Sequence, residues 1–195
     1  MINYNNVIVP NPLGLPEKFI APLKFVELVE GHPFYTSDLP TKEEIEEVKI
    51  FLLEEKGMNK ANVDYICEMV NQVAMAATTC IVDGKSIPLI LSPTGREVDP
   101  MILAHELVHC EQMASGRLVV DSNTMIFTWE GEEFSQDRIV KIQTWGESAI
   151  KDLYHGFKFM VGQMFLPWER EAYSKNNLDF LLDQVKELVP DCPYL

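Results

Sequence analysis

Two of the chain's four histidines lie four residues apart, in the segment His105-Glu-Leu-Val-His109. On an α-helix this spacing places both imidazoles on one face, one turn apart, where their nitrogen atoms can bind the same Zn²⁺ ion. Glu106 follows the first histidine, and its carboxylate can take a proton from a metal-bound water molecule without being a ligand itself. The pattern therefore predicts a zinc site with His105 and His109 as ligands and Glu106 as a general base.

A further protein ligand is needed, because a catalytic zinc ion usually has three protein ligands and an open position for water. Residues 110–116, directly after His109, contain no histidine. We therefore expect a carboxylate that a later helix brings to the metal. The segment Trp168-Glu-Arg-Glu-Ala-Tyr173, which follows Pro167 at the start of an expected helix, offers two glutamates.

Glu169 and Glu171 cannot both face the metal, because positions two apart on a helix point about 200° apart. Glu169 shares its expected face with Ala172, which is small enough to let two helices approach, and with Tyr173, a neutral donor. Glu171 instead brings Lys175 to the same face, and a cation beside a metal ion is unfavourable. We expect Glu169 as the third ligand, and Glu171 stays open as the alternative.

An HExxH motif followed by a glutamate in an ExxA helix resembles the gluzincin branch of zinc metallopeptidases. The similarity covers roughly residues 86–175 and extends to small single-domain metallopeptidases found in bacteria and their phages. It is carried by the segments His105-Glu-Leu-Val-His-Cys-Glu-Gln, Thr128-Trp-Glu-Gly-Glu-Glu-Phe134 and Leu166-Pro-Trp-Glu-Arg-Glu-Ala-Tyr173. The resemblance implies hydrolysis of peptide bonds, with His105, His109 and Glu169 as zinc ligands and Glu106 as the catalytic acid/base.

Hydrolysis of a peptide bond also needs a group that stabilises the tetrahedral oxyanion. Tyr154, His155 and Tyr173 are the candidates, because the families implied by the resemblance commonly use a tyrosine or a histidine there. For Tyr154 and His155 ordinary helix packing is the alternative, since no specific motif surrounds them. The substrate implied is a peptide or protein, which the expected strand at residues 86–91 can bind by adding it to the sheet.

The composition excludes several classes of partner. The 195 residues include 16 basic and 30 acidic side chains, giving a net charge of −14. This argues against binding nucleic acid or an anionic membrane surface, because both depend on Lys and Arg. No apolar run is long enough to span a bilayer, and the N-terminus lacks the pattern of a secretory signal. The four cysteines form no CxxC pair, so we expect reduced thiols in a cytoplasmic protein of a bacterial cell or a phage-infected host.

Local sequence signals predict a mixture of helices and strands. Thr41 with Glu44 fits a capping box, and Asp83-Gly84 is a strong hairpin signal. Pro88 lacks an N–H group, so its strand should lie at a sheet edge. The expected helices cover residues 15–30, 41–56, 60–77, 100–115 and 147–164, a segment from residue 168, and residues 178–189. The expected strands cover residues 78–82 with 86–91 and residues 117–120 with 124–129, in two hairpins.

These elements predict an α+β fold, in one zincin-like domain that spans residues 1–195 and begins with an irregular, Pro-rich segment at 1–40. We expect a small, mostly antiparallel sheet with an edge strand packed on the HExxH helix. A second helix is expected to supply the third ligand.

Two other functions are compatible with the sequence. The chain can be a zinc-containing protein that binds peptides without cleaving them, in which case Glu106→Gln changes no activity. Alternatively, the net charge of −14 fits an acidic DNA mimic that occupies a nucleic-acid-binding enzyme. A DNA mimic would bind a basic partner in a salt-sensitive way that His105→Ala leaves unchanged.

Overall fold

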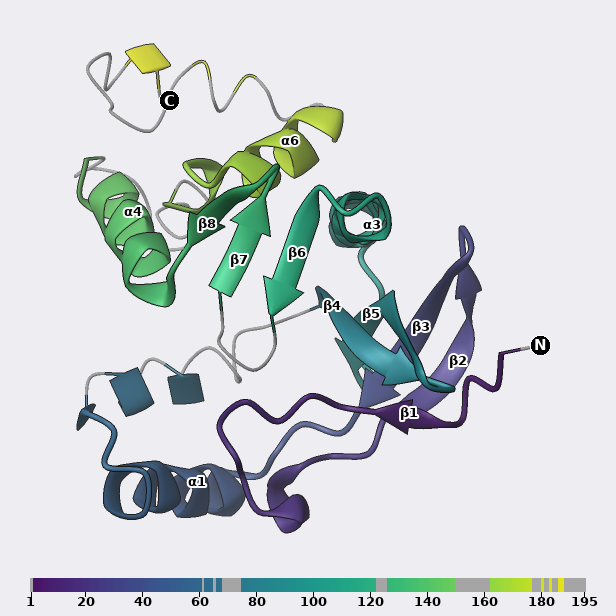
Figure 1. The fold of residues 1–195 in the computed structure, drawn as a ribbon, viewed down its shortest axis with the longest axis vertical. Helices are drawn as coiled ribbons and strands as arrows, with labels where there is room; N and C mark the ends of the chain where they lie inside the picture. Colours follow the sequence, from purple (N-terminus) through teal and green to yellow (C-terminus); the bar gives the residue numbers. More distant parts are fainter. Residues whose placement is uncertain are drawn as a thin grey trace. The chain divides into compact units, whose positions relative to one another are not determined.

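The structure is a computed structural model that describes residues 2–60, 62–64, 66–67, 75–121, 126–149, 162–176, 180, 183 and 186–187, with only the backbone at 145–149. Its internal contacts divide the chain into two compact units, residues 1–99 and residues 100–195 (Figure 1). Both units combine helices with antiparallel strands, so the expected α+β class is confirmed. The zincin-like topology stays a prediction, as does the packing of the first unit's sheet on the HExxH helix.

The first unit contains a five-stranded sheet with the strand order β1-β4-β5-β3-β2. Strands β3 and β5 pair in parallel, and the other three pairs are antiparallel. The sheet is therefore mostly antiparallel, as expected. The strands are β1 (Val7–Ile8), β2 (Lys24–Val29), β3 (His32–Ser37), β4 (Ala76–Val82) and β5 (Lys85–Pro93).

The hairpin of β4 and β5 turns at Asp83-Gly84, as the sequence predicts. The φ angles of these two residues are 51° and 76°, and positive values at both positions give the turn whose twist matches that of the flanking strands. Val82 pairs with Lys85 at the start of the ladder.

The prediction that Pro88 marks a sheet edge is wrong, because β5 is an inner strand between β4 and β3. Pro88 pairs with Thr79 of β4, whereas the parallel pairing with β3 begins only at Ile90. The proline therefore precedes the part of β5 that has a neighbour on both sides, and the strand tolerates its missing N–H group.

The prediction of a helix at residues 15–30 is wrong. The prediction that residues 1–40 are irregular is also wrong. Only Glu17–Phe19 forms a short 3₁₀ helix, and β2 and β3 then form a hairpin that turns at Glu30-Gly31. Pro22 cannot donate to a helical hydrogen bond, and Glu30 and Gly31 have φ angles of 50° and 86°. The turn and the proline together favour strand over helix.

Helix α1 (Lys42–Glu54) confirms the capping prediction. The Glu44 N–H group donates to the Thr41 hydroxyl at 3.2 Å, and the Thr41 N–H group donates to the Glu44 carboxylate at 2.7 Å. Ile45 and Leu52 pack with Val63 and Cys67 in a small core.

The helix expected at 60–77 is too long. Residues 60, 62–64 and 66–67 are helical, but β4 already begins at Ala76. Residues 61, 65 and 68–74 of that range lie outside the described residues.

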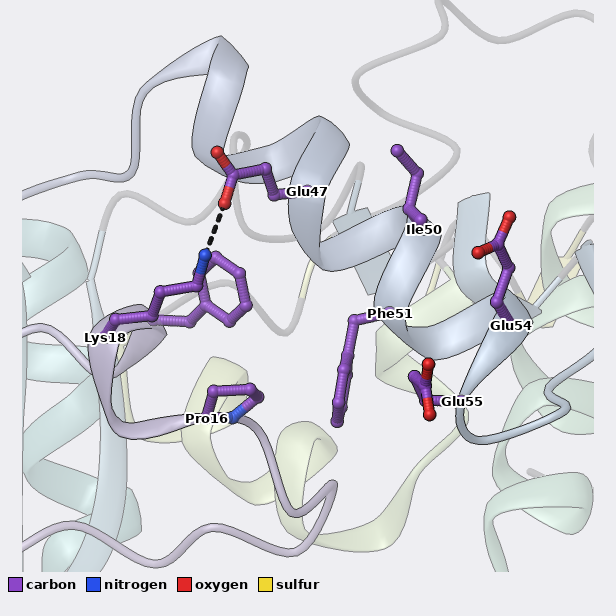
Figure 2. A pocket seen from close by; sticks show the side chains of 8 residues that line it. Pro16, Lys18, Glu47, Ile50, Phe51, Glu54 and Glu55 are labelled. Carbon is purple, nitrogen blue, oxygen red and sulfur yellow. Dashed lines mark hydrogen bonds and ion pairs between the residues drawn. The ribbon is translucent and has the colours of Figure 1, made fainter.

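An open hollow lies between the 3₁₀ helix and α1 in the first unit (Figure 2). Phe19, Phe51 and Ile50 give it an apolar lining, and Lys18 donates to Glu47 at 2.6 Å on its rim. No histidine or cysteine lines this hollow, and none of the predicted site residues belongs to it.

The second unit contains a three-stranded antiparallel sheet of β6 (Leu118–Asp121), β7 (Ile126–Trp129) and β8 (Glu132–Phe134), with the order β6-β7-β8. The antiparallel pair of β6 and β7 confirms the sequence prediction, although residues 122–125, which connect the two strands, lie outside the described residues. Strand β8 was not predicted; it follows a tight turn at Glu130-Gly131. The helices of this unit are α3 (Pro100–Ala114), α4 (Gln136–Ala149) and α6 (Pro167–Lys175).

The core of the second unit surrounds Trp168, the second residue of α6. Its ring stacks on Phe127 with centroids 5.5 Å apart and meets the ring of Phe134 edge-on at 5.2 Å. The start of α6 is therefore anchored on the three-stranded sheet. Other buried members of this core are Leu118, Trp129, Ile142, Phe165 and Leu166.

Other predicted features are only partly covered by the described residues. Of the helix expected at 147–164, residues 147–149 end α4 and residues 162–164 are helical, while 150–161 lie outside the described residues. Of the helix expected at 178–189, residues 180, 183, 186 and 187 are described and helical. Cys67, Cys80 and Cys110 are buried and form no disulfide bond within the described residues, whereas Cys192 lies outside them. Within the described part of the chain, no helix combines the length and apolar character needed to cross a membrane.

Candidate metal centre

Helix α3 carries the HExxH motif and is ended by a glycine. Gly116 has a φ angle of 75°, and its N–H group donates to the Met113 carbonyl at 3.1 Å. The Arg117 N–H group donates to the Gln112 carbonyl at 3.0 Å, which completes a Schellman motif. The helix thus ends where the sequence predicts.

The two histidines of α3 face α6 within the second unit, where the two helices are in contact. His109 is buried at 7% exposure, and His105 lies one turn earlier and is half-buried. Helix α6 begins at Pro167, one residue before the start expected from the sequence, and the buried Trp168 and Ala172 hold it in place. Glu169 therefore projects from the first turn of a helix whose position is fixed on both sides of it.

Three side-chain atoms converge between α3 and α6. The Nε2 atom of His105 lies 3.1 Å from the Nε2 atom of His109 and 3.1 Å from the Oε2 atom of Glu169. The third distance, from His109 Nε2 to Glu169 Oε2, is 3.4 Å. Among the described residues, these three form the group of potential ligands that could hold a metal ion.

The spacing of these atoms fits zinc. Ligand atoms at the corners of a tetrahedron, each about 2.0–2.1 Å from a central Zn²⁺, are about 3.3 Å from one another. The three observed distances of 3.1, 3.1 and 3.4 Å agree with this spacing. Two imidazole nitrogens and one carboxylate oxygen are also a donor set that zinc prefers, with a fourth position for water.

The electrostatics of the metal-free cluster are dominated by attraction between Glu169 and His109. Burial raises the pKa of Glu169, but the charge of His109 and hydrogen bonds from both histidines outweigh it and bring the pKa down to about 2. Burial lowers the pKa of His109, but Glu169 and a hydrogen bond to Gln112 outweigh this and raise it to about 9. Without a metal, the cluster is therefore an ion pair at neutral pH.

Glu106 and Tyr173 lie next to the cluster. Glu106 directly follows His105 on α3, and its charge contributes to the raised pKa of both His109 and Tyr173. The ring of Tyr173 lies 4.5 Å from the His105 ring, centroid to centroid. Burial and the charges of Glu169 and Glu106 raise the pKa of Tyr173, so the phenol keeps its proton at neutral pH.

The alternative ligand, Glu171, points elsewhere. Its carboxylate accepts two hydrogen bonds from the Arg117 guanidinium and lies 3.2 Å from Lys175 Nζ. Arg117 also packs over the Trp129 ring and pairs with Glu130. The structure therefore brings Glu169, and not Glu171, to the two histidines. The two other oxyanion candidates, Tyr154 and His155, lie outside the described residues.

Sequence reasoning missed one residue of this site, Gln112. It is 1% exposed, its Oε1 atom lies 2.8 Å from His109 Nδ1, and its Nε2 atom donates to the Trp168 carbonyl at 3.0 Å. The available signal was its position three residues after His109, which puts it on the same face of the helix.

Comparison with known proteins adds no relative: no family model, no curated protein and no solved structure matches the chain. The resemblance to gluzincins stays a hypothesis, and the site is interpreted from its own geometry.

Proposed function

We propose that this chain is a zinc-dependent metallopeptidase. The observation that carries the proposal is the convergence of His105 Nε2, His109 Nε2 and Glu169 Oε2 within 3.1–3.4 Å of one another. Glu106, the residue that an HExxH site uses as its base, directly follows the proposed ligand His105 in α3. The proposed ligands come from α3 and α6, two helices that are in contact.

The proposed chemistry divides among five side chains and the metal. Bound Zn²⁺ supplies Lewis acidity, which lowers the pKa of a water molecule and polarises a peptide carbonyl. His105, His109 and Glu169 hold the ion. Glu106 takes a proton from the attacking water and delivers it to the leaving amine. Tyr173 keeps its proton and can donate a hydrogen bond to the oxyanion.

The test combines metal analysis with digestion of a peptide library. We expect about one zinc ion per chain after supplementation, and cleavage that Glu106→Gln lowers by about 10²–10⁴-fold while zinc is retained. Glu111→Gln is the matched control, because Glu111 is exposed on the same helix and forms a 3.4 Å surface pair with Lys175. We expect this control to retain wild-type cleavage.

Two results would contradict the proposal. The first is that the wild-type protein is well folded but takes up no zinc, because the proposal depends on a bound zinc ion. Zinc binding with no cleavage, or with equal cleavage in wild type and Glu106→Gln, would favour a zinc protein that binds peptides without hydrolysing them.

A further inference from the structure

We propose that Gln112 is a positioning residue that presents His109 Nε2 to the metal and holds α6 so that Glu169 reaches the same point. This inference rests on the proposed function, because it assigns Gln112 a role in assembling the zinc site. It starts from a buried side-chain amide that joins the metal-binding face of α3 to the first turn of α6.

The hydrogen bonds determine how the amide is oriented. The Trp168 carbonyl can only accept, so the Gln112 group facing it at 3.0 Å must be the NH₂ group. The Gln112 oxygen therefore faces His109 Nδ1 at 2.8 Å, and an oxygen acceptor requires a proton on Nδ1. A neutral His109 with its proton on Nδ1 carries its lone pair on Nε2, the atom that points at His105 and Glu169.

The second hydrogen bond acts on α6. Trp168 directly precedes Glu169, and its side chain is fixed between Phe127 and Phe134. The Gln112 amide holds the backbone of the same residue against α3. The side chain and the backbone of Trp168 are thus held from two directions. This fixes the backbone position from which the Glu169 side chain projects.

A neutral amide suits this position better than the carboxylate often found behind a metal-binding histidine. A glutamate at position 112 could still accept from His109 Nδ1, but in its ionised form it could not donate to the Trp168 carbonyl. A methionine has a similar length and does neither. The variants Gln112→Glu and Gln112→Met therefore separate the two hydrogen bonds.

The first experiment measures zinc affinity and the cobalt absorption spectrum of the full chain. We expect Gln112→Met to weaken zinc binding by about 10–100-fold and to alter the ligand-field bands of bound Co²⁺. Gln143→Met is the control, because Gln143 is a partly buried glutamine of the same unit that donates to Gln163 at 2.9 Å, outside the cluster. We expect Gln143→Met to retain wild-type affinity and spectrum.

The second experiment needs no metal. Metal-free His109 carries protons on both ring nitrogens at neutral pH, and we expect NMR to show a protected Nδ1–H resonance that loses its protection in Gln112→Met and keeps it in Gln112→Glu. We expect Gln112→Glu still to change the cobalt spectrum, because the bond to Trp168 is lost. If Gln112→Met fails to fold, Gln112→Glu still tests the link to α6.

Wild-type zinc affinity and an unchanged Nδ1–H signal in Gln112→Met would overturn the inference. So would equal losses in Gln112→Met and Gln143→Met, which would indicate a general packing defect. If the wild-type protein binds no zinc, the proposed function fails. The NMR comparison then still decides whether Gln112 orients His109.

Discussion

At the scale of single residues, His109 is the side chain at which protons would compete with the proposed metal. In the metal-free protein its pKa is about 9, because the attraction of Glu169 outweighs burial. Its Nε2 atom must lose a proton before it can bind zinc. We expect zinc binding at pH 7 to release about one proton and to tighten as the pH rises towards 9. Calorimetry in two buffers of different ionisation enthalpy measures this release, and binding without proton release would contradict the assignment.

The same ion pair should make the stability of the metal-free protein depend on pH. The pKa of His109 is raised from 6.5 to about 9, so its contribution is complete below pH 6.5 and is lost as the pH rises through 9. The pKa of Glu169 is lowered from 4.5 to about 2, so its contribution is complete above pH 4.5 and is lost on acidification. We expect the Tm of chelator-treated protein to fall between pH 6 and pH 9.5.

Glu169→Gln provides the control for this pH dependence. The variant removes the charge that raises the pKa of His109, so its Tm should change less between pH 6 and pH 9.5 than that of the wild type. An equal change in both proteins would place the cause outside this ion pair.

At the scale of elements, the orientation of α6 is supported by the pair of Arg117 and Glu171. Hydrogen bonds from Arg117 lower the pKa of Glu171, so the pair stabilises the fold above pH 4.5 and loses this effect on acidification. Because the Arg117 side chain is 40% exposed, we expect Glu171→Gln to cost only about 0.5–1 kcal/mol at pH 7. Urea unfolding of both proteins at pH 7 and pH 3 measures this difference in the free energy of unfolding.

The difference between wild type and Glu171→Gln should shrink at pH 3, and zinc binding should persist in the variant. Loss of zinc binding in Glu171→Gln would instead indicate that Glu171 is a ligand. Glu133→Gln, a change at an exposed position of β8, serves as the control for removing one carboxylate.

The end of α3 depends on the conformation of Gly116. Its φ angle is 75°, and a Cβ atom there would meet no other atom within 4 Å. We therefore expect Gly116→Ala to cost about 1–2 kcal/mol through backbone strain alone. Thermal unfolding measures the cost, and an unchanged Tm would show that the helix end adapts. Zinc affinity should persist, because the two histidines lie more than one turn before this glycine.

Local chemistry in the sequence was enough to predict α3, α6 and the choice of Glu169. The four-residue spacing of the histidines, Pro167 and the position of Lys175 each act within one helical turn, and Lys175 indeed pairs with Glu171. Gln112 could not be found in this way. Its role depends on a carbonyl 56 residues later, and nothing in its immediate neighbours distinguishes it from any buried glutamine.

The wrong predictions arose where the conformation of a segment depends on the strands with which it pairs. Residues 24–29 have apolar spacing compatible with a helix, and only their pairing with β3 makes them a strand. Pro88 signals an edge strand, but β3 approaches β5 only from Ile90 onwards. Strand β8 is short and carries two glutamates, so its sequence offers little β signal without its partner β7.

At the scale of the whole molecule, all three proposed ligands belong to the second unit, residues 100–195. We therefore expect added zinc to slow amide hydrogen exchange mainly in α3 and α6, because the ion holds these helices together. The hairpin of β4 and β5 in the first unit should exchange at a similar rate with and without zinc. Mass spectrometry of the full chain measures both regions, and equal protection throughout would contradict this expectation.

The candidate ligands His105 and Glu169 are 64 positions apart in the chain. An ion bound by both side chains would act as a reversible cross-link. It would close the intervening polypeptide into a loop, as a disulfide does. Cross-links over loops of this length restrict the unfolded ensemble by on the order of 4 kcal/mol in the simplest chain-entropy model. Unlike a disulfide, this tether would open with a chelator instead of a reductant, so metal supply would control how long the protein persists.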